Sequence, residues 1–151
     1  MKQRASFFSA LCVFLFTTSL PLVSAAEFKS VGAQPAVLYD APSYSGHKVF
    51  IAPSGMPVEL ILTQDGWSKI RDASSDLSWV EASALTNKHT VVVTSASTGL
   101  FVATDPRAAL LANLGQGVWL SLLTPASRDW VKVMHSDGEI GFVKAADVWG
   151  D

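Results

Sequence analysis

The residue types that most often carry catalysis are scattered along this sequence, without the spacing that a catalytic or metal site requires. The three histidines stand singly, with no HxH or HExxH pattern: His47, His89 and His135. The acid pairs Asp72/Asp76 and Asp137/Glu139 fall in predicted turns, where carboxylates typically accept hydrogen bonds from nearby backbone N–H groups. These patterns predict no metal site.

Nucleophilic and phosphate-binding motifs are equally absent from the sequence. The serines form neither a GxSxG turn nor an SxxK pair, and no glycine-rich phosphate loop occurs. The sole cysteine, Cys12, lies in the apolar N-terminal segment, so it offers no thiol chemistry to the remainder of the chain. We therefore expect a non-enzymatic protein that holds no cofactor.

Aromatic side chains are better candidates for function. Tyr39 and Tyr44 flank the loop from Asp40 to Ser45, and Trp67 and Trp79 alternate with apolar residues that should point inward. Large aromatic rings suit neutral sugars and peptides, because they offer wide contact area at little cost in side-chain entropy. The candidate ligand-binding residues are Tyr39, Asp40, Tyr44, Trp67 and Trp79. For the two tryptophans, an alternative is that their rings cover sheet seams or dock one half of the chain on the other.

An internal repeat determines the elements that must position these residues. Shifting the sequence by 63 positions lays Trp67–Leu85 onto Trp130–Val148 without a gap, and an offset of 62 aligns the segments upstream. Each copy reads as short alternating strands separated by turn residues, which predicts an all-β fold made of two similar small units. A single short helical turn is expected after the last long strand of each copy.

The alternation also predicts which residues fill each core. Side chains at alternate positions of a strand face opposite sides of the sheet. The residues that we expect inside are Leu60, Ile70, Val80, Val133 and Val143. On the opposite face, Trp67 and Trp79 should lie opposite or diagonal to one another, within aromatic contact, and Trp130 and Phe142 should take the same places in the second copy.

Four motifs follow one another in the first copy: VLYDAPS (37–43), SGMPVEL (54–60), DGWSKI (65–70) and SWVEASAL (78–85). Copy two repeats them in degenerate form. Their order and spacing resemble the bacterial SH3-like (SH3b) domain. The resemblance implies two tandem SH3-like small β-barrels. It also implies a binding module of the cell envelope that recognises peptidoglycan peptides or an envelope protein. The alternative is a structural scaffold, or accessory subunit, of an envelope enzyme complex.

The N-terminus has the three parts of a secretory signal. Lys2 and Arg4 precede an uncharged run, and small residues end that run at Ala25 and Ala26, either of which can be the cleavage point. We expect a signal peptide at 1–26, one domain at 27–88 and a second at 89–151, and a periplasmic or secreted protein without a stable membrane anchor after cleavage. The two-residue joint Asn87-Lys88 and the small size of each half predict that the two domains dock on one another.

The charge balance excludes some partners. The chain has a net charge of −2, which becomes −4 once Lys2 and Arg4 leave with the signal peptide. Without a basic stripe, nucleic acid is an unfavourable partner, and so are anionic lipid headgroups.

We also expect the first copy to carry recognition and the second to support it. The first copy keeps a polar Tyr-Asp-Ala-Pro-Ser-Tyr loop at 39–44, whereas the second has the apolar run 108–112, which favours burial against a neighbour.

Overall fold

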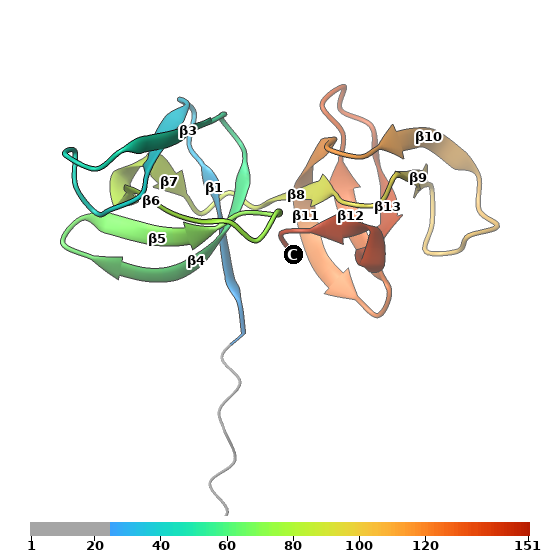
Figure 1. Ribbon diagram of the computed structural model, residues 1–151. Helices are drawn as coiled ribbons and strands as arrows, with labels where there is room; N and C mark the ends of the chain where they lie inside the picture. Colours follow the sequence, from blue (N-terminus) through green and yellow to red (C-terminus); the bar gives the residue numbers. More distant parts are fainter. Residues whose placement is uncertain (1–24) are drawn as a thin grey trace, which may run out of the picture.

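The computed structural model describes residues 25–151, which form two seven-stranded antiparallel sheets side by side (Figure 1). The predicted all-β fold is therefore confirmed. Most of the predicted signal peptide, 1–24, lies outside the described residues. Among residues 25–151, no helix is long and apolar enough to span a membrane.

The first sheet comprises seven strands in the order β3-β2-β6-β5-β4-β1-β7. Their bounds are β1 Glu27–Val31, β2 Ala36–Tyr39, β3 Lys48–Ala52, β4 Pro57–Gln64, β5 Trp67–Arg71, β6 Leu77–Glu81 and β7 Leu85–Thr86. A 3₁₀ turn, η1 (Ala82–Ala84), joins β6 to β7, as the sequence predicted.

The second sheet repeats this order seven elements later, as β10-β9-β13-β12-β11-β8-β14. Its strands are β8 Thr90–Val93, β9 Ser97–Phe101, β10 Leu110–Gly115, β11 Trp119–Ser127, β12 Trp130–Met134, β13 Ile140–Lys144 and β14 Val148–Trp149, with η2 (Ala145–Asp147) before the last. The internal sequence repeat is therefore a repeat of topology.

The first core lies on one face of a strongly curled sheet. Fully buried residues from β1 to β6 share one cluster, and Leu85 of β7 packs against it, so both ends of the strand order reach the same interior. Ile70 and Val80 are inside it, as predicted. Leu60 is not: the prediction was wrong because β4 runs past the core, its residues from Ile61 onward are exposed, and a register shift follows Leu60.

The second core is built in the same way. Val133 and Val143 are completely buried, which confirms their predicted inward direction. The cluster is completed by other buried side chains of the second sheet: Val91, Val93, Leu100, Leu114, Leu120 and Val131.

The two sheets contact each other through β1, β4, β8 and the C-terminal segment. The Ser30 and Thr90 hydroxyls lie 2.7 Å apart, and Thr90 Oγ1 donates a hydrogen bond of 2.6 Å to the carbonyl of Gly55. Phe28 meets Trp149 edge to face, with ring centroids 5.0 Å apart. The C-terminus therefore lies at the junction (Figure 1).

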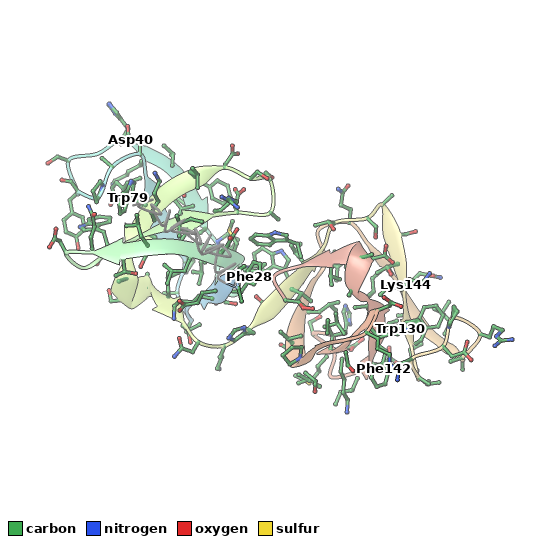
Figure 2. The ribbon with its side chains drawn as sticks, turned by 90° about the horizontal axis from the view of Figure 1, so that it is seen from below. Phe28, Asp40, Trp79, Trp130, Phe142 and Lys144 are labelled. Carbon is green, nitrogen blue, oxygen red and sulfur yellow. The ribbon has the colours of Figure 1, made fainter. Side chains whose placement is uncertain are left out.

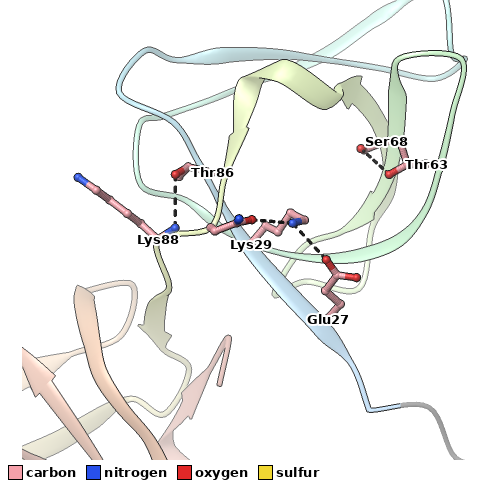
Figure 3. Close-up of polar contacts among 7 residues, drawn as sticks. Glu27, Lys29, Thr63, Ser68, Thr86 and Lys88 are labelled. Carbon is pink, nitrogen blue, oxygen red and sulfur yellow. Dashed lines mark hydrogen bonds and ion pairs between the residues drawn. The ribbon is translucent and has the colours of Figure 1, made fainter.

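Polar contacts also fix the joint between the sheets (Figure 3). Lys29 donates a hydrogen bond of 2.8 Å to Asn87 Oδ1 and forms an ion pair of 3.1 Å with Glu27. The backbone N–H of Lys88 donates to Thr86 Oγ1 at 3.3 Å. These bonds tie Asn87 to β1 and Lys88 to β7, so both residues of the short joint are anchored.

Candidate ligand-binding site

Three aromatic rings form a cluster on the outer face of the first sheet. Tyr39, at the end of β2, lies edge-on to Trp67, at the start of β5, with centroids 5.4 Å apart. Tyr44, from the loop after β2, contacts both, at 6.3 Å from Tyr39 and 5.1 Å from Trp67. Strand parity places the strand residues of this cluster outside the core, because Leu38 and Ile70 face inward.

Only Tyr44 is openly exposed in this cluster. Its side chain is 68% exposed, whereas Tyr39 and Trp67 are only 6% and 8% exposed. As candidate ligand-binding residues on the outer face, Tyr39 and Trp67 were expected to be open to a ligand, and this is wrong, because the mutual edge-on packing of the rings removes both from solvent. Strand alternation gives the face on which a side chain lies, but not what a loop residue folds over it.

Glu81 completes the cluster, although the sequence reasoning did not select it. It is the cross-strand neighbour of Trp67, at the end of β6. Its carboxylate accepts a hydrogen bond from the Tyr44 phenol, and this bond is the main reason why the pKa of Tyr44 is raised above its usual value. The pairing of β5 with β6 in one hairpin is the feature from which Glu81 can be recognised as the neighbour of Trp67.

Asp40 builds the loop that carries Tyr44. Its Oδ1 accepts a hydrogen bond of 2.8 Å from the backbone N–H of His47, which closes the loop. Gly46 is required at this closure, since a Cβ there would lie 2.9 Å from the same oxygen and 3.1 Å from the carbonyl of Ser43. This carboxylate oxygen is therefore engaged in holding the loop.

Trp79 is the cross-strand neighbour of Tyr39, but its ring makes no aromatic contact with the cluster among residues 25–151. It pairs with Lys69 across the hairpin, while Trp67 pairs with Glu81, so the two tryptophans are diagonal as predicted. The predicted ring contact between them is not found among residues 25–151; instead, the Lys69 ammonium sits 5.8 Å from the Trp79 ring centroid. Figure 2 shows Trp79 and Asp40 toward the same end of the first sheet.

The second sheet repeats the strand part of this arrangement. Phe101 and Trp130 meet edge to face at 5.7 Å, and the Lys132 ammonium lies 6.0 Å from the centroid of Phe142. The expected burial of run 108–112 is wrong at Leu110, which is 48% exposed. The run continues into β10, the edge strand of the second sheet, which has a neighbouring strand on one side only.

The acidic pairs serve turns, as the sequence indicated. Asp72 Oδ1 accepts hydrogen bonds from the backbone N–H groups of Ser74 and Asp76, at 2.8 and 2.9 Å. Asp137 accepts from the backbone N–H of Glu139, which, ahead of the neighbouring His135, lowers the pKa of its carboxyl.

No group of three or more metal-ligating side chains occurs within residues 25–151.

The first sheet contains the segment that is similar to a known family. Residues 32–87 match the bacterial SH3 domain family. The matched segment includes Tyr39, Tyr44, Trp67 and Glu81, so the aromatic cluster lies inside it. No curated protein sequence matches the chain.

Two solved structures are similar to the chain at low identity, "Structure of NlpC2 from Trichomonas vaginalis" and "Structure of NlpC1 from Trichomonas vaginalis". The first is 8% identical with a TM-score of 0.40, over 84% of this chain and 49% of that one. The second is 7% identical with a TM-score of 0.40, over 93% of this chain and 51% of that one. This chain thus corresponds to about half the length of each.

Proposed function

We propose that this protein is an exported, non-enzymatic binding module of the cell envelope, and that it recognises peptidoglycan peptides or an envelope protein. The observation that carries the proposal is the cluster of Tyr39, Tyr44 and Trp67 within the segment that matches the bacterial SH3 domain. A partly exposed aromatic surface with a carboxylate at its edge can hold an apolar part of a peptide and orient a polar one.

In this proposal Tyr44 contacts the ligand, and the rings of Tyr39 and Trp67 hold Tyr44 in place. Its ring is exposed on one side and packed on Tyr39 and Trp67 on the other, so it stays in place before a ligand arrives. Such preorganisation reduces the entropy lost on binding. Glu81 fixes the phenol oxygen and gives the surface a negative charge next to the ring.

The test is retention on purified sacculi, run beside an envelope lysate. Tyr44→Ala should reduce retention about fivefold or more, as the loss of a central aromatic contact typically does. The melting temperature should change little, since most of this side chain faces solvent. Tyr44→Phe keeps the ring and removes the bond to Glu81, so it separates ring contact from phenol orientation.

Ile140→Ala serves as the matched control, because Ile140 is 49% exposed and lies in a hairpin of the second sheet. Equal retention of wild type, Tyr44→Ala and Ile140→Ala would contradict the proposed site. Retention by sacculi identifies the peptidoglycan ligand, whereas retention only by a lysate protein identifies the protein ligand.

A second candidate function is that of an accessory subunit that positions an envelope enzyme. The edge strand β3 favours it, since Val49, Phe50 and Ile51 are each at least half exposed in succession, beside the acidic turn at Asp72 and Asp76. An exposed apolar edge is a template for an added strand. The partner would be a protein strand with a basic residue facing this turn. Phe50→Lys, which blocks such pairing, should abolish the lysate interaction and leave binding to sacculi intact.

A further inference from the structure

The aromatic face of the second sheet has the opposite charge to that of the first. Equivalent positions around the conserved tryptophan, Trp67 or Trp130, carry Asp65, Lys69 and Glu81 in the first repeat and Arg128, Lys132 and Lys144 in the second. Register confirms the equivalence of the last pair, since Glu81 faces Trp67 and Lys144 faces Trp130. Two acids of the first repeat are therefore replaced by two cations, although the scaffold is the same.

The second aromatic face is also open where the first is filled. Tyr44 covers Trp67 in the first repeat, but the equivalent position in the second is Pro106, and Trp130 is only partly buried. Two hollows, of about 500 and 420 Å³, flank Trp130, and Arg128 and Asp129 line both of them. Figure 2 shows Trp130, Phe142 and Lys144 on one side of the second sheet.

The cations around Trp130 are free to meet a ligand. Arg128, Lys132 and Lys144 are exposed, and none has an ion-pair partner within residues 25–151. In the first repeat, by contrast, Lys69 and Glu81 are half-buried, and Glu81 is bonded to Tyr44.

Arg128 adopts a backbone conformation that its residue type disfavours. Its φ is +61°, in the first position of the two-residue turn between β11 and β12. Asp65 takes the equivalent place in the first repeat with φ +49°, but aspartate tolerates this region better than arginine. Strained residues that persist often have a functional reason, and here the strain places a guanidinium beside both hollows.

We propose that the face formed by Arg128, Trp130, Lys132, Phe142 and Lys144 binds a short acidic peptide, with carboxylates on the cations and an apolar side chain on the Trp130 ring. The guanidinium matches a carboxylate with two parallel hydrogen bonds, and the ammonium groups add charge without fixed geometry. Asp129 is the one acid that lines the hollows, and cations outnumber it, because Arg128 lines both hollows, Lys132 the first and Lys144 the second.

The remainder of the molecule limits the ligand to a short one. The chain has a net charge of −2, and the equivalent face of the first repeat carries more acids than cations. Beyond the hollows, the net negative charge of the chain would repel a long polyanion. The inference goes beyond the proposed function, because it assigns a second site with its own ligand class, and its test does not involve sacculi.

The experiment titrates the purified protein with the peptide Ac-Ala-Glu-Ala bearing a free C-terminal carboxylate, with Ac-Ala-Gln-Ala amide as the neutral probe. Binding is followed by NMR through the indole N–H signal of Trp130, which Trp130→Phe identifies by its loss. The acidic peptide should shift this signal and bind more weakly at high salt, whereas the neutral peptide should not shift it.

The deciding variant carries Arg128→Asp and Lys144→Glu, which install the first-repeat residues. It should bind the acidic peptide about tenfold more weakly or worse, because both contacts change from attractive to repulsive. Lys48→Glu with Lys88→Glu alters net charge equally at exposed sites elsewhere and should bind as wild type does. Lys132→Gln with Lys144→Gln gives a milder second variant should the first fail to fold.

Three results would overturn the proposal. These are no shift of the Trp130 signal with the acidic peptide, equal binding of the acidic and neutral peptides, and equal weakening in the control and deciding variants. A loss of sacculus retention in Tyr44→Ala that leaves acidic-peptide binding unchanged would show that the two sites are independent.

Discussion

Ile70 is completely buried among residues from the neighbouring strands of the first sheet, so truncating it removes contacts that no other side chain replaces. Ile70→Ala should lower the free energy of unfolding by about 2 to 5 kcal/mol, through lost burial and an unfilled cavity. Leu60→Ala, at a half-buried position just before the exposed end of β4, should cost clearly less. Denaturant titration of both variants measures the difference, and equal losses would contradict the core assignment.

Tyr39 contributes more to stability than its position outside the core suggests. Strand alternation places its side chain outside the core, and from that position alone its removal should cost little stability. Because Tyr39 is 6% exposed and packs against Tyr44 and Trp67, its truncation removes buried contacts and destabilises the cluster. Binding by this face is therefore tested by substituting Tyr44, because this exposed side chain can be removed with little loss of stability.

Among the elements, the hairpin between β4 and β5 depends on a turn of two residues with positive φ. Asp65 and Gly66 join β4 to β5 with φ values of +49° and +81°, the backbone of a two-residue hairpin turn. Gly66→Ala should destabilise the protein by about 1 to 2 kcal/mol, because a Cβ is disfavoured in this region. The space around the added Cβ is open, so the loss would be conformational rather than steric.

Gly115→Ala is the control for this turn. Its surroundings are equally open, but its φ is not positive, so the alanine should be tolerated or slightly stabilising. Thermal melts of both variants give the comparison. A Gly66→Ala protein that melts with the wild type would show that the turn relaxes at no cost.

At the scale of the whole molecule, the two sheets are joined by specific contacts as well as by the chain. The hydroxyl of Thr90 bonds to Ser30 and to the carbonyl of Gly55, and Phe28 packs on Trp149. We predict that the halves unfold together, so that at least one of the fragments 27–88 and 89–151 is unstable when expressed alone. Calorimetry of each fragment and of the parent tests this, and two well-folded fragments that both melt with the parent would refute it.

Thr90→Val examines the same junction without cutting the chain. The substitution keeps the shape of the side chain but removes the hydroxyl that bonds to Ser30 and donates to the Gly55 carbonyl, which should cost about 1 to 3 kcal/mol of unfolding free energy. The backbone N–H of residue 90 still donates to Ser30 Oγ. If the halves unfold as one unit, the single transition moves to lower temperature. Splitting into two transitions would show that this contact is what couples them.

The sequence by itself determined the all-β class, the division into two similar units and four of the five inward residues that it named, with Leu60 the exception. Two signals in the sequence support these conclusions. The internal repeat shows that each local pattern occurs twice, and apolar residues alternate with the period of two that a strand requires. The short turns after β6 and β13 and the glycine at the hairpin turn follow from the same local rules.

Only the tertiary structure decided how the candidate site is built. The sequence placed Tyr39 and Tyr44 at one loop but expected Trp67 to contact Trp79, and the structure instead brings Trp67 to the two tyrosines. The burial of Tyr39 and Trp67 depends on how the loop from Asp40 folds back over the sheet. The pairing register of β5 and β6 places Glu81 beside Trp67. Leu60 lies outside the core because β4 continues beyond the core. Each of these outcomes depends on contacts between segments distant in sequence, and local patterns carry no information about such contacts.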